Sequence, residues 1–152
     1  MRIDTIVFGP VEVPEDKIFH MSKGPLGFED TTDYALVEKQ DQDVVLRWFQ
    51  AVDTTVPCFV VFNPFEIVNG YEPVVEPHDL RALECDGVDE LDYLVIAVIS
   101  EDISKSTVNL KSPIVINREK HTAGQVILRN DYPIRFSLVQ SEGAPAVDNM
   151  VG

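Results

Sequence analysis

This sequence has little of what marks a membrane protein or a disulfide-rich secreted protein. Its longest apolar run, from Tyr93 to Ile99, is of strand length and far below the ~20 residues that a membrane-spanning helix needs. There are two cysteines, Cys58 and Cys85, and the first residues of the chain show no export signal. We therefore expect reduced thiols and a cytoplasmic protein.

Motifs for catalysis and metal binding are also missing. The three histidines, His20, His78 and His121, lie far apart, and none has the nearby second histidine that is common in zinc sites. The sequence contains no Gly-x-Ser-x-Gly nucleophile elbow, no phosphate-binding Gly-x-x-x-x-Gly-Lys and no dinucleotide fingerprint. We therefore predict no catalytic residue, no metal and no cofactor, and we favour a protein that works by binding.

Basic residues are few. Lys and Arg number 12 against 26 acids, which gives a net charge of −14. Such a surface repels nucleic acid and anionic membranes, and it attracts basic partner proteins. High net charge also favours a monomer when the protein is free. The plainer interpretation of the same charge is solubility.

Short apolar runs rich in Val, Ile, Phe and Tyr are abundant, and turn-forming residues separate them. This pattern predicts an all-β, mainly antiparallel domain of barrel or sandwich type over residues 1–140, with one or two short helices. Residues 141–152 are expected to form a flexible tail. A proline suited to a first helical turn predicts a helix over 77–83. The expected strands are 3–8, 11–13, 17–19, 34–38, 44–50, 58–62, 91–100, 107–110, 114–117, 125–128 and 134–139.

Acidic residues are concentrated between Glu72 and Asp92. This segment holds eight acids and one base, Arg81, and so carries half of the net charge. It fits either a solvated helix and loop or a docking face for a basic partner. As a docking face, its candidate partner-binding residues are Glu72, Glu76, Asp79, Glu84, Asp86 and Glu90.

A series of short motifs follows in order along nearly all of residues 1–140. The most specific is the run TVNLKSPIVIN at 107–117. The others are Phe8-Gly9, GPLGFE at 24–29, WFQA at 48–51, the stretch 59–71 with its Asn63-Pro64, GQVIL at 124–128 and YPIR at 132–135. In these motifs the sequence resembles the FliW family of flagellar assembly factors. Mild departures from the family pattern occur at Ala51, Asn63 and Val126.

The resemblance implies a regulatory binding protein without a cofactor. Members of this family bind flagellin in the cytoplasm, and in many bacteria they also bind CsrA, a small RNA-binding translational repressor. CsrA that is held in this way cannot repress flagellin messenger RNA. The alternatives are a flagellin chaperone without a CsrA partner and a small β-barrel enzyme with an acidic cleft.

The motif residues fall into three groups by side chain. The glycines Gly24, Gly27 and Gly124 are expected in turns, and Phe28, Trp48, Leu110, Ile114 and Ile116 are expected in the core. The polar members fit either hydrogen bonds that hold turns or contacts with a partner; they are Asn109, Lys111, Asn117, Gln125 and Arg135. Asn109, Lys111 and Asn117 join the acids as candidate partner-binding residues.

Overall fold

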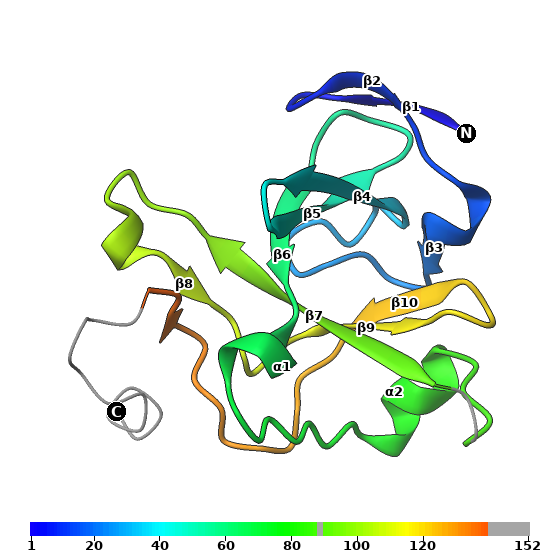
Figure 1. Ribbon diagram of the computed structural model, residues 1–152. Coiled ribbons are helices and arrows are strands. Elements are labelled where there is room, and N and C mark those ends of the chain that lie inside the picture. The colour runs from blue at the N-terminus through cyan, green and yellow to red at the C-terminus, as the bar shows by residue number, and fades with distance from the viewer. Residues whose placement is uncertain (88–89, 140–152) are drawn as a thin grey trace.

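The computed structural model of the protein describes residues 1–87 and 90–139 (Figure 1). The expected tail and Asp89 lie outside these residues. The strands are β1 (Arg2–Thr5), β2 (Gly9–Glu12), β3 (Ile18–Met21), β4 (Asp33–Asp41), β5 (Val44–Ala51), β6 (Cys58–Phe62), β7 (Leu91–Val98), β8 (Thr107–Val108), β9 (Ile114–Asn117), β10 (Thr122–Gln125) and β11 (Phe136–Ser137). The helices are α1 (Pro64–Ile67) and α2 (Pro77–Ala82), with 3-10 turns η1 (Glu15–Lys17) and η2 (Ile103–Lys105).

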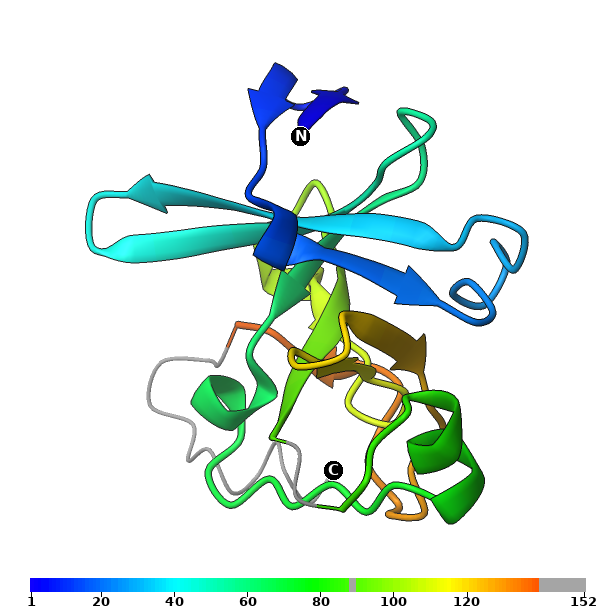
Figure 2. The same ribbon diagram turned by 90° about the vertical axis from the view of Figure 1, so that its right-hand side faces the viewer.

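The main sheet closes into a barrel. Its strands follow the order β7-β6-β5-β4-β3-β10-β9, and β9 pairs back onto β7 with Ile114 opposite Leu94. The neighbours in this ring are antiparallel except β3 and β10, which run parallel. Figures 1 and 2 show the ring with α1 and α2 below it. The predicted all-β fold with two short helices is confirmed.

One edge of β7 is shared by two strands. β9 pairs with Leu91 through Leu94, and β8 pairs with Ala97 and Val98 farther along the same strand. β11 adds to β8 and extends the sheet beyond the ring. Residues 109–113 connect β8 to β9, and this connection holds two of the candidate residues.

Strand β9 is buried on both faces, which explains its continuous apolar sequence. Ile114 and Ile116 point into the barrel with Tyr34 and Phe49, whereas Val115 belongs to a second core outside the barrel wall. That second core packs under α1, α2 and the segments that follow β8 and β10; it contains Val68, Tyr71, Leu83, Val95, Val108, Leu110, Val126, Leu128 and Phe136. The burial predicted for Leu110, Ile114 and Ile116 is confirmed.

A third, smaller core fixes the N-terminal hairpin on the outside of the barrel. Ile3 and Val13 pack against Ala35 and Val37 of β4, and the partly buried Trp48 joins them. The hairpin of β1 and β2 therefore lies across the outer face of β4 and β5, as Figure 1 shows. Trp48 contributes to this outer cluster and not to the barrel interior.

Two predictions around β10 are wrong. The strand begins at Thr122 and ends at Gln125, so Gly124 lies in a strand and not in a turn. Residues 126–128 form no strand, although Val126 and Leu128 are buried. Their amides bond to the irregular 109–113 connection, with Val126 N donating to the carbonyl of Pro113 at 3.1 Å. Residues 126–128 thus have the alternating apolar pattern of a strand, but the segment beside them is irregular and cannot form a regular strand pair with them.

Phe28 and α1 also differ from the prediction. Phe28 is 43% exposed and contacts Phe59 edge-to-face with ring centroids 5.7 Å apart, so it is not a core residue. The Asn63-Pro64 pair starts α1, a short helix whose position the sequence did not indicate. Asn63 caps that helix by accepting a hydrogen bond from Phe65 N at 3.0 Å, and Pro64 occupies the first turn.

Candidate partner-binding surface

The centre of the acidic segment is α2, and its C-terminal end is fixed to the barrel. Leu83, which follows the helix, is 1% exposed in the second core. Its carbonyl accepts hydrogen bonds from Asn117 Nδ2 at 3.1 Å and Thr122 Oγ1 at 2.6 Å. Lys120 Nζ donates to the next carbonyl, that of Glu84, at 3.1 Å. These donors satisfy carbonyls at the helix end, so Asp79 on α2 and Glu84 just after it hold a fixed position.

The segment before α2 is held just as firmly. Asn130 Oδ1 accepts from Val74 N at 2.7 Å, and Asn130 Nδ2 donates to the carbonyl of Glu72 at 3.0 Å. Glu72 N in turn donates to the hydroxyl of Tyr132 at 2.9 Å. Backbone groups of an irregular segment therefore have partners without a strand ladder. The result is a rigid path from Glu72 to α2.

Glu76 lies between these two anchors and is paired with a cation. Arg129 Nε and Nη2 approach its two carboxylate oxygens at 2.9 and 3.0 Å, which is the bidentate geometry of a strong ion pair. The hydrogen bond from Arg129 lowers the pKa of Glu76, and the same bond raises the pKa of Arg129. Glu76 is thus partly neutralised and contributes less to attraction of a partner than its formal charge suggests.

Other cations reduce the charge of the segment at its far end. Lys120 Nζ lies 3.7 Å from Asp86, and Arg118 Nη2 lies 3.2 Å from Glu90. Among the described residues, Glu72 and Glu84 form no ion pair, and both are exposed. Within the described ranges, the candidate acids without a lysine or arginine partner are therefore Glu72 at the start of the segment, Asp79 on α2 and Glu84 just after it.

The acidic segment and the connection that holds Asn109 and Lys111 meet at Asn130. Asn109 Oδ1 accepts from Lys111 N at 3.1 Å and Ser112 N at 3.0 Å, which fixes the connection between β8 and β9 as an Asx-type turn. Lys111 Nζ then donates to the carbonyl of Asn130, the residue that holds Glu72. The sequence alone did not indicate this role of Asn130, because its partners lie far away along the chain.

Asn117 does not belong to the partner-binding surface. Its side chain is fully buried at 0% exposure, with Nδ2 on Leu83 and Oδ1 accepting from Lys120 N at 3.3 Å. A buried amide held on both sides positions α2 and offers no surface to a partner. We therefore correct its candidate role from contact to anchoring of the acidic face.

A small cavity lies beside α2. It has a volume of about 260 Å³ and lies between α2 and the loop that follows β3, with Gly24, Leu26, Asp79, Ala82 and Gln125 among its lining residues. Its walls mix polar and apolar groups, and they carry one acid, the half-buried Asp79, and one base, Lys23.

The described residues hold no group of three His, Cys, Asp or Glu side chains that could bind a metal ion. Within the same ranges, no helix is long and apolar enough to cross a membrane. Cys58 and Cys85 form no disulfide with each other in the structure. Burial raises the pKa of Cys58, which disfavours its reactive thiolate.

Comparison with known proteins decides the family. A model of the FliW protein family matches residues 2–138. The chain belongs to the FliW family. It is similar to the flagellar assembly factor FliW of Syntrophus aciditrophicus, with 37% identity over 142 residues that cover 93% of this chain and 89% of the relative. The FliW of Ruminiclostridium cellulolyticum is 32% identical over 140 residues, covering 91% of this chain and 95% of the relative.

A solved crystal structure of a flagellar assembly factor FliW has the same fold. It superposes with a TM-score of 0.81 at 29% identity and covers 95% of this chain and 100% of that chain. The barrel with its attached second core is therefore the FliW fold, and the protein is a flagellar assembly factor.

Several FliW motif residues join loops of this fold. Gln125 Oε1 accepts from Leu26 N at 2.8 Å, and Gln125 Nε2 donates to the carbonyl of Ser112 at 3.2 Å. Gly24 lies where a Cβ atom would be 2.2 Å from the carbonyl oxygens of Phe28 and Thr31. These motif residues thus bring together the loops that surround the small cavity beside α2.

Proposed function

We propose that this FliW-family protein binds flagellin in the cytoplasm and sequesters the translational repressor CsrA, thereby relieving repression of flagellin messenger RNA. It acts as a monomer through binding alone and has no catalytic chemistry of its own. The observation that carries the proposal is the rigid acidic face around α2.

Charge supports CsrA as a partner of this face. A protein that binds RNA carries a basic surface, and RNA and an acidic protein attract that surface by the same Coulomb force. Fixed acids attract it at a lower entropic cost than mobile ones, because their backbone is already ordered. Glu72 and Glu84, which are exposed and without an ion pair among the described residues, are the main contributors. Lys111 and Asn109 extend the same surface through Asn130.

The two partners are proposed to be linked by competition. If flagellin and CsrA each lower the affinity for the other, the factor releases CsrA when flagellin accumulates, and the coupling is reciprocal. When flagellin is exported, this protein is free to bind CsrA again. This circuit requires no cofactor and no contact between the factor and nucleic acid.

The experiment that tests the acidic face is charge reversal. The variant Glu72→Lys, Asp79→Lys, Glu84→Lys leaves Glu76 in place, because Glu76 holds Arg129. We expect the association rate with purified CsrA at low salt to fall at least about tenfold, and the difference to shrink as salt rises. An unchanged association rate at low salt would refute the proposed role of this face.

A control variant makes the same change in net charge elsewhere. It carries lysine at three exposed acids away from α2, namely Asp4, Asp53 and Glu101. If net charge alone governed association, the control would slow it as much as the α2 variant. We expect a much smaller effect. Titration with flagellin monomer separates the alternatives: a chaperone without a repressor partner binds flagellin and shows no saturable binding of CsrA.

A further inference from the structure

Strand β4 has a free edge. β3 pairs with β4 only up to Ile18 opposite Ala35, and the chain before it turns away in η1. β4 continues to Asp41 with β5 as its strand partner among the described residues. Figure 2 shows the hairpin of β4 and β5 projecting from the barrel. On the outer edge of β4, residues 36–41, six of the nine in the strand, therefore lie beside no other strand among the described residues.

The direction of the backbone groups on this edge follows from the pairing. Val52 N donates to the carbonyl of Asp33 at 3.0 Å, which places the odd-numbered residues of β4 on the β5 side. In an antiparallel strand, successive residues direct their N–H and C=O groups to opposite edges. Leu36, Glu38 and Gln40 therefore direct their N–H and C=O groups toward the free edge, which is a template for another strand.

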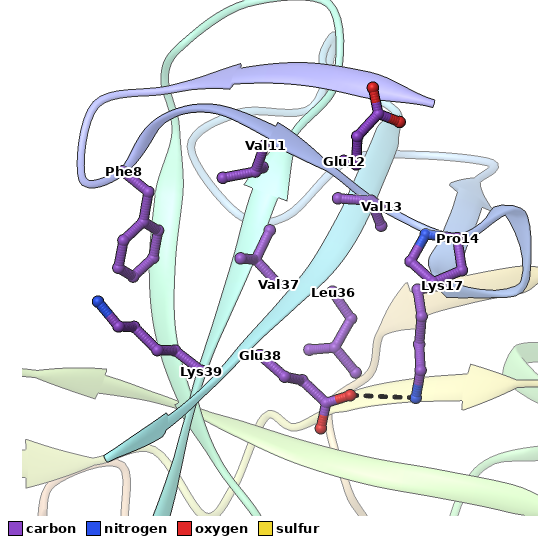
Figure 3. A pocket seen from close by; sticks show the side chains of 10 residues that line it. All are labelled: Phe8, Val11, Glu12, Val13, Pro14, Lys17, Leu36, Val37, Glu38 and Lys39. Carbon is purple, nitrogen blue, oxygen red and sulfur yellow. Dashed lines mark ion pairs between the residues drawn. The ribbon is translucent and has the colours of Figure 1, made fainter.

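A groove lined by both apolar and charged side chains lies beside this edge, and its charged residues are Glu12, Lys17, Glu38 and Lys39. It has a volume of about 470 Å³ and lies between the β1–β2 hairpin and β4. Figure 3 shows Phe8, Val11 and Val13 from the hairpin segment and Val37 of β4 among the side chains that line it, with Val13 and Val37 packed together at its buried side. Lys39 Nζ closes one end, 5.0 Å from the centre of the Phe8 ring.

We propose that an extended segment of another protein adds to the free edge of β4 as a strand and places an apolar side chain in this groove. The edge recognises an extended backbone through hydrogen bonds, and the groove selects one side chain of the alternating set that faces it. Because this site lies on the barrel side opposite α2, as Figure 1 shows, it does not depend on the role proposed for the acidic face.

Charge identifies the kind of segment. A second copy of this chain would bring together two molecules of net charge −14, so self-association through this edge is disfavoured. The exposed Asp41 and Asp43 lie at the end of the β4 edge and favour a basic residue at the matching end of the segment. The occupant is therefore a segment of a different protein with alternating apolar residues and with a lysine or arginine at the end that meets Asp41 and Asp43.

The test uses the isotope-labelled full chain and a synthetic peptide of alternating threonine and valine with a lysine at each end. In NMR spectra we expect the chemical shifts of the Leu36, Glu38 and Gln40 amides to change saturably as peptide is added, and hydrogen exchange at these amides to slow. We also expect the chemical shifts of the Phe8 and Val11 side chains to change. Shifts confined to α2, or no saturable binding, would overturn the proposal. If the chemical shifts of these amides changed with protein concentration in the absence of peptide, the occupant of the edge would be a second copy of this chain, and the proposed partner segment would be wrong.

Two variants at one position separate strand addition from simple groove binding. Gln40→Pro removes an N–H from the free edge and leaves the β4–β5 ladder intact, because proline is tolerated where the N–H faces solvent. We expect peptide affinity to fall about tenfold, whereas Gln40→Val, which keeps the N–H, binds like the parent. Equal affinities of the two variants, with spectra that show an intact fold, would overturn strand addition. Val11→Asp adds a charge to the groove and should abolish binding.

Discussion

Replacement of Asn117 by alanine tests whether this motif residue anchors α2 or contacts a partner. The change removes a hydrogen bond to the Leu83 carbonyl and one from Lys120 N. Each contributes about 1 kcal/mol, and the cavity left by a fully buried amide costs about 1 kcal/mol more. Thr122 Oγ1 still bonds to Leu83, which limits the loss. We therefore expect Asn117→Ala to reduce the free energy of unfolding by about 2–4 kcal/mol.

Thermal unfolding followed by circular dichroism measures this loss. For a domain of this size, about 3 kcal/mol lowers Tm by roughly 6–12 °C. Binding of CsrA measured well below that Tm should change less than stability does, because the side chain has no exposed surface. Asn109→Ala is the comparison, since Asn109 is only half-buried and fixes a local turn. An unchanged Tm together with lost CsrA binding would refute the anchoring role.

Two further predictions concern the glycines and a buried tyrosine. Gly24→Ala should destabilise by at least about 3 kcal/mol in urea titrations, because its Cβ meets two carbonyl oxygens at 2.2 Å. Gly124→Ala, whose Cβ lies 3.7 Å from a flexible leucine methyl, should change stability by less than about 1 kcal/mol; equal effects would contradict this reasoning. Burial raises the pKa of Tyr34 to about 12. The unfolded side chain ionises near pH ~10, so stability should fall as pH rises from there to the folded pKa. Tyr34→Phe should show a smaller alkaline loss, and an unchanged pH profile would contradict this assignment.

The elements with a local cause were predictable from the sequence. Pro77 indicated α2, and the apolar runs indicated most of the barrel strands. Closure of the sheet into a barrel was not predictable from the sequence. It depends on the parallel pairing of β3 with β10 and on the pairing of β9 with β7, which join segments far apart along the chain. No local pattern encodes these registers. The role of Asn130 was hidden for the same reason, since its partners Glu72 and Val74 lie more than 50 residues earlier.

Polar motif residues stabilise the fold, whereas the surface acids are available to attract a partner. Within the motif run 107–117, Asn109 fixes a turn, Ile114 and Val115 fill two cores on opposite faces of one strand, and Asn117 holds the end of α2. One segment thus meets several constraints at once, which explains why it is the most specific signature in the sequence. The exposed acids meet no such constraint, because exposed charges contribute little to stability. Substitutions among them are therefore expected to tune affinity and association rate for a partner while the barrel that presents them stays unchanged.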